Sequence, residues 1–272
     1  MVTPHTDRPL ALVTGASSGI GYELAKQFAQ HGYDLLIAAE DAAIEQAGRD
    51  LAQLGTRVEA ARVDLATYEG VEQLYGTLAS LGRPLDVAAI NAGVGVGGDF
   101  TETDLAAELN LLQLNVVSTV HLAKRVVKDM APRGQGRILF TASIASVMPG
   151  PYEAVYGASK AFVLSFSASL RAELKGKGIT VTALMPGPTN TNFFHRAGMD
   201  DTYAGQVAKR FNDPADVARQ GFEALMAGRD RVVSSSLGTK IQGAVARFVP
   251  EALKAELHRR LSAPGSGPMK HN

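Results

Sequence analysis

Short runs of aliphatic and β-branched residues alternate with longer amphipathic segments along most of this chain. Six of the apolar runs have the length and composition of buried strands. They cover residues 10–14, 35–39, 57–63, 87–91, 137–141 and 180–185. The segments between them, such as residues 20–30 and 71–81, are long enough to be helices. This repeated β-α order predicts an α/β fold.

The strand sequences also predict how the sheet is covered. Residues 35–39 read Leu-Leu-Ile-Ala-Ala, an apolar run without alternation, which is typical of a parallel strand buried on both faces. We therefore expect a doubly wound parallel sheet of about seven strands with helices on both faces. No linker composition occurs before residue 262, where Ser-Ala-Pro-Gly-Ser-Gly-Pro begins. Residues 1–261 are predicted to form one domain, and residues 262–272 a flexible tail.

Composition narrows the classes of function. The 272 residues contain 27 Lys plus Arg and 27 Asp plus Glu, so no net charge favours binding to nucleic acid or to an anionic membrane. The absence of cysteine excludes thiolate metal sites and a cysteine nucleophile, and we expect no metal. The first nine residues lack a signal-peptide core, and no apolar stretch is long enough to span a membrane. We expect a cytoplasmic protein that acts on a small molecule.

The first strand runs directly into a glycine-rich loop that opens a helix. The loop reads Thr14-Gly15-Ala16-Ser17-Ser18-Gly19-Ile20-Gly21. Glycines in this context let the backbone approach a pyrophosphate at a helix N-terminus, although a loop that serves only tight strand-to-helix packing is the alternative. We favour dinucleotide binding through Gly15, Ser17, Ser18, Gly19, Ile20 and Gly21.

Polar groups also follow the third and fourth strands. Asp64 and Leu65 follow one, and Asn91, Ala92 and Gly93 follow the other. Either group could merely end its strand. Ligands in doubly wound sheets lie at the carboxyl ends of the strands, so these residues are predicted to face the adenine and ribose.

The chemical signal is the segment Tyr156-Gly157-Ala158-Ser159-Lys160, at the start of a helix predicted to end near residue 174. A spacing of four places Tyr156 and Lys160 on one helical face. An ammonium there lowers a phenol pKa from its reference of ~10 and makes the tyrosine a usable acid/base. Ser143 follows the fifth strand, where its hydroxyl is placed to hydrogen-bond the same substrate oxygen. Taken singly, a surface Lys-Tyr pair or a turn serine is the simpler interpretation; together, behind a dinucleotide loop, they favour catalysis.

These motifs, in this order, resemble the short-chain dehydrogenase/reductase family in its compact type with a single Rossmann-like domain. The resemblance covers roughly residues 10–233. It implies that Tyr156 is the general acid/base, that Ser143 positions the substrate oxygen, and that Lys160 lowers the tyrosine pKa and holds the nicotinamide ribose. It also implies that Asn115 holds a water of a proton relay; a buried amide satisfied by backbone is the alternative.

The resemblance extends to the loop after the sixth strand, Pro186-Gly187-Pro188-Thr189-Asn190-Thr191. In the family such a loop contacts the nicotinamide carboxamide and the phosphates, which implies roles for Pro186, Gly187, Thr189 and Thr191. Residues 192–212 are then expected to form a mobile flap over the substrate, with Phe193 and Phe194 as possible apolar walls.

The family chooses its dinucleotide at the end of the second strand, which here reads Ala38-Ala39-Glu40-Asp41. Glu40 stands where phosphate-binding members often have arginine, and its carboxylate would repel a 2′-phosphate and could accept a ribose hydroxyl. We therefore expect NAD(P)(H), with a lean to NAD(H). A preference for NADP(H) would instead require a basic group from elsewhere in the chain, such as Arg62, to reach the 2′-phosphate.

The sequence predicts hydride transfer between the dinucleotide and an alcohol or carbonyl carbon. Two alternatives remain: a non-catalytic dinucleotide-binding regulator, and an epimerase or dehydratase of the same superfamily. The intact Ser143, Tyr156, Lys160 and Asn115 weigh against the first, and the glycine spacing weighs against the second. A homo-oligomer, dimer or tetramer, is expected by similarity, although residues 238–261 could block one interface.

Overall fold

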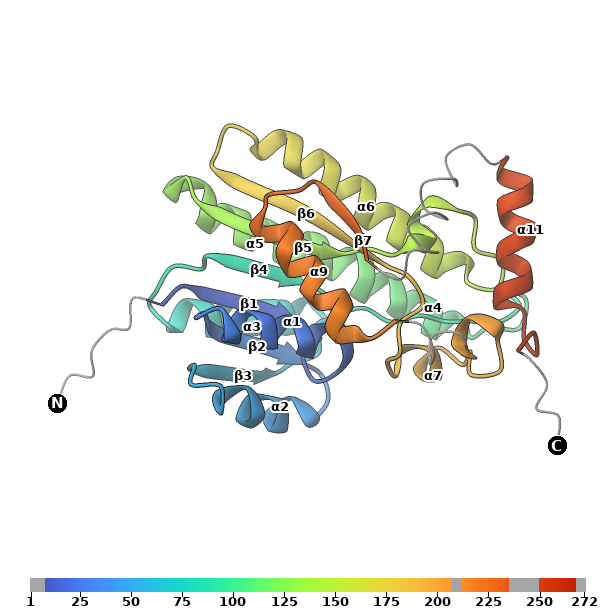
Figure 1. The fold of residues 1–272 in the computed structure, drawn as a ribbon, viewed down its shortest axis with the longest axis horizontal. Coiled ribbons are helices and arrows are strands. Elements are labelled where there is room, and N and C mark those ends of the chain that lie inside the picture. Colours follow the sequence, from blue (N-terminus) through green and yellow to red (C-terminus); the bar gives the residue numbers. More distant parts are fainter. Residues whose placement is uncertain (1–7, 207–211, 235–249, 268–272) are drawn as a thin grey trace.

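The computed structural model describes residues 8–206, 212–234 and 250–267 of the 272-residue chain. Within them, seven parallel strands form one sheet in the order β3-β2-β1-β4-β5-β6-β7 (Figure 1). The strands are β1 (Leu10–Thr14), β2 (Asp34–Ala39), β3 (Val58–Arg62), β4 (Val87–Ile90), β5 (Gly136–Thr141), β6 (Ile179–Pro186) and β7 (Arg231–Ser234). The predicted doubly wound α/β fold is confirmed. Each of the six runs overlaps one strand to within one residue at each end, and the pattern did not locate β7.

The centre of the sheet sets the position of the site. β1 pairs with β2 on one side and with β4 on the other, so Leu12 lies opposite Leu36 and Ala88. The strand order reverses at the gap between β1 and β4, which is where ligands bind in sheets of this topology. Every residue of β1, β2 and β4 is buried, because helices cover both faces.

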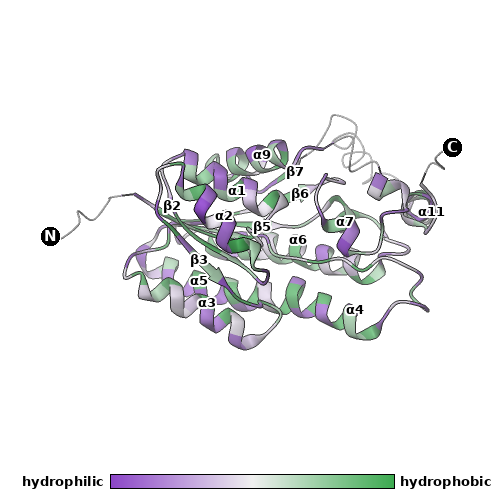
Figure 2. Cartoon of the chain, turned by 90° about the horizontal axis from the view of Figure 1, so that it is seen from below, coloured by the Kyte–Doolittle hydropathy of each residue, from purple (hydrophilic) through white to green (hydrophobic). Residues whose placement is uncertain are grey.

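Helices form one layer on each face of the sheet (Figure 2). One layer contains α1 (Gly19–Gln30), α2 (Ala43–Ala52) and α9 (Pro214–Met226), and the other contains α3 (Tyr68–Ser80), α5 (Thr119–Met130) and α6 (Ala154–Leu174). Aromatic pairs pack edge to face on both sides of the sheet. The ring centres of Phe28 and Phe222 lie 5.4 Å apart, and those of Phe140 and Phe166 lie 5.6 Å apart. Each such ring contributes roughly 1.5–3 kcal/mol of burial free energy.

A further helical stretch precedes α5 without a break in the chain. It comprises α4 (Leu105–Leu112) and a π-helical segment, η1 (Gln113–Ser118). None of the helices in the described part of the chain is long and apolar enough to cross a membrane.

Two helices from late in the chain lie beyond the carboxyl ends of the strands (Figure 1). α7 (Phe193–Arg196) belongs to the predicted flap, of which residues 207–211 lie outside the described residues, as do residues 238–249 of the C-terminal segment. α11 (Glu251–Ser262) is followed by a turn that bonds to the flap: Gly265 N donates to Asp201 Oδ2, and Tyr203 N donates to Ser266 Oγ. The predicted boundary between a domain of residues 1–261 and a flexible tail of residues 262–272 stays a prediction.

A buried carboxylate fastens the amino-terminal edge of the sheet. Asp34 begins β2 and is 2% exposed. Its Oδ2 lies 2.6 Å from an Arg83 guanidinium nitrogen, and its Oδ1 accepts hydrogen bonds from Arg57 N and Thr56 Oγ1. Burial raises the pKa of Asp34, but hydrogen bonds from Arg83, Arg57 and Thr56 together outweigh it and hold that pKa below its ordinary value.

This arrangement makes the fold sensitive to acid at a defined position. Because the folded pKa of Asp34 is depressed, its contribution is complete above the unfolded pKa of ~3.9 and is lost as the pH falls through the lower folded value. We expect Asp34→Asn to lower the free energy of unfolding by roughly 1–3 kcal/mol at pH 7, and by less near pH 3. Urea denaturation at both pH values measures this, with Asp216→Asn, in an exposed ion pair on α9, as the control. If the loss of unfolding free energy in Asp34→Asn is as large near pH 3 as at pH 7, the depressed pKa of Asp34 is contradicted.

Candidate active site

One cavity of about 260 Å³ opens at the carboxyl ends of the central strands. It brings together every site residue predicted from the sequence except Asn115. These are Gly15, Ser17, Ser18, Gly19, Ile20, Gly21, Glu40, Asp64, Leu65, Asn91, Ala92, Gly93, Ser143, Tyr156, Lys160, Pro186, Gly187, Thr189 and Thr191. Their convergence is a structural fact, and the role of each stays a prediction.

The glycine loop leaves the N-terminus of α1 open to an anion. Ser18 is the N-cap residue, yet its side chain caps no backbone N–H, and the first turn of α1 contains no acidic residue. By contrast, Thr67 caps α3 and Asp213 caps α9. A Cβ on Gly21 would lie 2.0 Å from Gly15 O, so the loop can approach the helix only with glycine there. Free N–H groups and the helix dipole fit the diphosphate of a dinucleotide.

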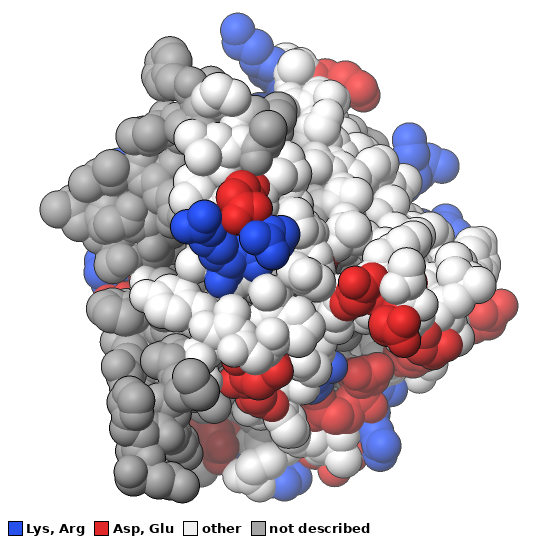
Figure 3. Space-filling view, turned by 90° about the vertical axis from the view of Figure 1, so that its right-hand side faces the viewer, with Lys and Arg blue, Asp and Glu red and all other residues white. Residues whose placement is uncertain are grey.

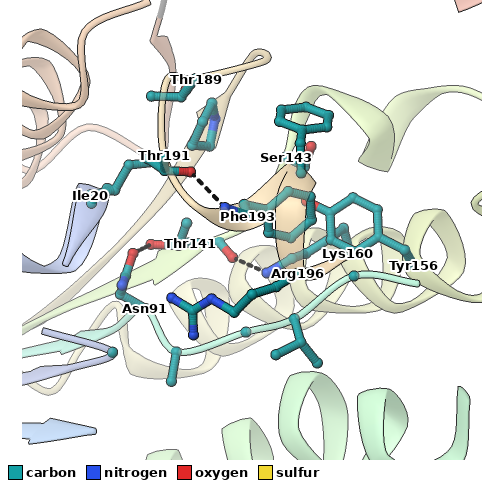
Figure 4. Close-up of a pocket in the computed structure, with 18 of the residues that line it drawn as sticks. Ile20, Asn91, Thr141, Ser143, Tyr156, Lys160, Thr189, Thr191, Phe193 and Arg196 are labelled. Carbon is teal, nitrogen blue, oxygen red and sulfur yellow. Dashed lines mark hydrogen bonds between the residues drawn. The ribbon is translucent and has the colours of Figure 1, made fainter. Parts of the chain in front are cut away.

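A line of hydrogen bonds connects this loop to the opposite side of the cavity. Asn91 Nδ2 donates to Thr14 O, and Thr141 Oγ1 donates to Asn91 Oδ1 at 2.9 Å. Lys160 Nζ in turn donates to Thr141 O at 2.9 Å (Figure 4). Asn91 thus uses its amide to join the ends of β1, β4 and β5, which makes it a positioning residue in addition to lining the cavity.

The hydroxyl groups of Ser143 and Tyr156 lie together in the cavity. Ser143 begins a short 3-10 helix, η3 (Ile144–Val147), and its Oγ accepts from Ala145 N. Tyr156 is in the first turn of α6, and its ring centre lies 5.1 Å from that of Phe193, which comes from the flap (Figure 4). Both side chains are buried, and Phe193 covers the Tyr156 ring on the flap side.

Burial dominates the proton affinities of the tyrosine and lysine. It raises the pKa of Tyr156; a hydrogen bond with Ser143 opposes this increase, and the nearby charge of Glu153 adds to it. Burial also lowers the pKa of Lys160 to about 8. The Lys160 ammonium lies 5.8 Å from the centre of the Tyr156 ring. The net direction for Tyr156 is opposite to the lowering that the resemblance implies, so that lowering stays a prediction.

Asn115 lies behind the cavity. It is 1% exposed and sits in η1, where the π-helical turn changes which side chains face inward. Its Oδ1 accepts from Val94 N at 3.0 Å, and its Nδ2 donates to Val94 O at 2.9 Å and to Ser159 Oγ at 3.1 Å. These contacts are those of a buried amide satisfied mainly by backbone. The proton-relay role stays a prediction that these side-chain contacts do not require.

The loop after β6 and the flap close the remaining side. Thr189 is buried and donates to Gly187 O, whereas Thr191 accepts from Phe193 N at 3.2 Å and so shapes the entry to α7. A Cβ on Gly19 would lie 3.0 Å from Thr191 Cγ2, so this loop packs against the glycine loop. A ligand bound at the glycine loop would therefore also touch the base of the flap.

The end of β2 carries two carboxylates. Glu40 is exposed at the cavity edge, and Asp41 accepts a hydrogen bond from Ser17 Oγ at 2.9 Å. Arg62 lies beside them and donates from Nε to the backbone oxygen of Glu40. The sequence indicated roles for Glu40 and Arg62 but not for Asp41. A carboxylate two residues after the strand is a signal that could have found it.

The cavity residues that the sequence did not single out include Glu153, Arg196, His258 and Ser262. Arg196 comes from α7, and its guanidinium approaches Ser18 Oγ of the glycine loop at 3.4 Å. Glu153 precedes α6, while His258 and Ser262 belong to α11. Only tertiary packing brings these residues to the cavity, so their spacing in the sequence does not indicate that they line it. In the part of the chain that the structure describes, no group of three or more acidic or histidine side chains could hold a metal.

Comparison with protein families gives one clear match. The family model described as short chain dehydrogenase matches residues 9–201, which contain the glycine loop, Ser143, Tyr156 and Lys160. An uncharacterised short-chain type dehydrogenase/reductase of Sinorhizobium fredii is 37% identical over 200 residues, covering 71% of this chain and 75% of the relative. A 1-deoxy-11-beta-hydroxypentalenate dehydrogenase of Streptomyces exfoliatus is 35% identical over 191 residues, covering 69% and 70%.

Solved structures share the fold. A short-chain dehydrogenase from Sphingobium yanoikuyae, in complex with NADPH, superposes with a TM-score of 0.78 at 27% identity. The match covers 88% of this chain and 93% of that one. The similarity therefore extends beyond the family-model region and includes most of the sheet and its helices.

The position of Lys160 predicts a pH dependence for dinucleotide binding. Because burial lowers its pKa to about 8, the ammonium is present below that pH and is lost as the pH rises through it. We expect dinucleotide affinity to weaken above pH 8 in the wild type. In Lys160→Met, which keeps an unbranched apolar side chain but no charge, affinity should be about tenfold weaker at pH 7 and nearly independent of pH between 7 and 9. Fluorescence titration measures both, and unchanged affinity in the variant would remove the ribose-holding role.

Proposed function

This chain belongs to the short-chain dehydrogenase/reductase family and is a dinucleotide-dependent oxidoreductase, and we propose that it uses Tyr156 as the general acid/base on an alcohol or carbonyl carbon. One observation carries the proposal. The hydroxyls of Ser143 and Tyr156 lie in the same cavity as the glycine loop, with the Lys160 ammonium beside them. A substrate oxygen held by the two hydroxyls would place its carbon within reach of a dinucleotide bound along that loop.

The chain's own residues supply binding, orientation and proton transfer. Bound NAD(P)(H) supplies or accepts the hydride. Tyr156 gives its proton to the oxygen of a carbonyl during reduction, or takes the proton of an alcohol during oxidation. Ser143 holds the same oxygen, and its bond from Ala145 N fixes the hydroxyl in place. Phe193 packs against the Tyr156 ring and limits the access of water.

The high proton affinity of Tyr156 fits this scheme in the direction of reduction. Burial keeps the phenol protonated near neutral pH, which is the form that a proton donor needs. Oxidation requires the phenolate, so we propose that the Lys160 charge, together with the positive nicotinamide ring, lowers the tyrosine pKa in the loaded enzyme. A screen of alcohols and carbonyls, each with NAD(H) and NADP(H) and followed by cofactor absorbance, tests the reaction class.

We propose NAD(H) as the preferred dinucleotide. Glu40 and Asp41 place two carboxylates at the edge of the cavity where the adenosine ribose would lie, and a 2′-phosphate there would be repelled. The complex of the Sphingobium yanoikuyae relative with NADPH favours the opposite choice. Arg62, held at the Glu40 carbonyl, is the group in this chain that would support NADP(H).

We further propose a cytoplasmic homo-oligomer. Leu105 and Leu109 share one face of α4 and are 69% and 52% exposed. Exposed leucines on one helical face support self-association, because association would bury them.

Tyr156→Phe tests the acid/base assignment. The variant keeps the ring and its packing on Phe193 but lacks the hydroxyl, so we expect turnover to fall by ~10²–10⁴ while dinucleotide affinity changes little. Tyr68→Phe, at an exposed position on α3, is the matched control and should retain full activity. Steady-state rates and fluorescence titration measure the two effects. Activity above a few per cent would exclude Tyr156, and loss of dinucleotide binding would indicate a structural role.

The carboxylates after β2 predict that NADH binds more tightly than NADPH. Glu40→Arg should shift the ratio of the two dissociation constants toward NADPH by about tenfold or more, because a repulsive charge becomes an attractive one. Arg62→Ala should leave the ratio nearly unchanged. If the wild type instead prefers NADPH and Arg62→Ala abolishes that preference, Arg62 binds the 2′-phosphate and the role proposed for Glu40 is wrong.

A further inference from the structure

A buried polar cluster lies in the wall of the active-site cavity, and its side chains make no hydrogen bond to Ser143 or Tyr156 among the described residues. It consists of Glu153, just before α6, and of His258 and Ser262 on α11. The three residues are 7%, 8% and 1% exposed, and all three line the cavity. The proposed reaction uses none of them.

The hydrogen bonds within the cluster involve only one oxygen of the carboxyl group. Ser262 Oγ donates to Glu153 Oε2 at 2.8 Å, and His258 Nε2 lies 3.1 Å from that oxygen and 3.1 Å from Ser262 Oγ. The serine proton points to the carboxyl group, so the serine oxygen is free to accept from the imidazole N–H. Glu153 Oε1 receives no hydrogen bond from any described residue. A buried carboxyl group is thus fixed by one oxygen while the other is available to a ligand.

The backbone before Glu153 is strained. Tyr152 has φ 66°, and it is the one non-glycine residue with positive φ in the described ranges. A bulky side chain disfavours this left-handed conformation, and a hydrogen bond from Gly98 N to Tyr152 O holds it. Strain of this kind persists where the surrounding structure requires a particular geometry, and it accompanies functional sites. Here it immediately precedes the residue that lines the cavity.

The two sides of α11 differ in character. Its outer side carries Glu256 paired with Arg259 and Arg260. Figure 3, which views this end of the molecule, shows basic and acidic side chains next to one another on a mostly uncharged surface. Its inner side contributes Leu261 to the cavity wall, which also includes the apolar side chains of Met148 and Phe193. The cavity wall therefore combines the polar cluster of Glu153 with apolar side chains.

We propose that Glu153 Oε1 binds an ammonium or hydroxyl group at the end of the substrate remote from its reacting carbon. This inference rests on the proposed function, because it places the reacting carbon at Ser143 and Tyr156. The substrate class is then a secondary alcohol or ketone with an apolar body and a terminal hydrogen-bond donor. A terminal carboxylate is disfavoured, since it would face a second carboxyl group.

Four alcohols that differ only at one end test the proposal: heptan-2-ol, heptane-1,6-diol, 7-aminoheptan-2-ol and 6-hydroxyheptanoate, with shorter and longer homologues of each. We expect kcat/KM for oxidation by the wild type to be highest for the ammonium compound, then the diol, then heptan-2-ol, and lowest for the carboxylate. In Glu153→Gln the preference for the ammonium compound over heptan-2-ol should fall by about tenfold or more, because the amide keeps the shape but lacks the charge.

Ser262→Ala is the matched control. It removes a hydrogen bond to Oε2 and leaves Oε1 in place, so the order of the four alcohols should persist. If the cluster serves only to hold α11, both variants would change all four alcohols by the same factor, and the proposal would be wrong.

Oxidation of heptan-2-ol by the wild type reports on the proposed function separately from this preference. If none of the four compounds is oxidised, calorimetric titration of the same compounds into the NAD⁺-loaded protein decides the inference. Equal affinities, or no binding, would overturn it.

Discussion

The amide of Asn91 holds together the ends of three neighbouring strands, and the geometry of the cavity depends on it. Its N–H binds the carbonyl of Thr14, from which the glycine loop departs, and its oxygen accepts the hydroxyl of Thr141. The carbonyl of Thr141 then receives the ammonium of Lys160. A single side chain thereby links the start of the glycine loop to the strand end that holds Lys160 of α6. Parallel strands supply this opportunity because all their carboxyl ends lie on one edge of the sheet.

Burial is the largest influence on the pKa values of Tyr156 and Lys160. Tyr156 and Lys160 are both enclosed, and enclosure favours the neutral form of each: the phenol holds its proton more tightly, and the ammonium releases its proton more easily. The two residues are thus related by their common burial as well as by their spacing of four on α6. The lysine is anchored to the sheet rather than to the tyrosine: its ammonium donates to Thr141 O and lies 5.8 Å from the centre of the Tyr156 ring.

The sequence predicted the elements that local pattern controls. The pattern of short strand-like runs located the five inner strands and the edge strand β3, and the predicted end of α6 near residue 174 agrees with its last residue, Leu174. β7 was not located, because four residues with partial exposure give no distinct pattern. Glycine and hydroxyl positions next to strand ends were recognisable because their function requires fixed spacing. Glu153, Arg196, His258 and Ser262 were not, because they reach the cavity through contacts that depend on how α7 and α11 dock.

The partners of Glu153 also fix the order in which the chamber can assemble. His258 follows Glu153 by 105 residues, and Ser262 comes later still. At typical rates of synthesis this separation corresponds to roughly 5–20 s on the ribosome. During that interval the strands β1 to β6 can pair, while Glu153 lacks its two hydrogen-bonding partners on α11. The sheet edge that carries the glycine loop can therefore form before α11 completes the wall of the cavity.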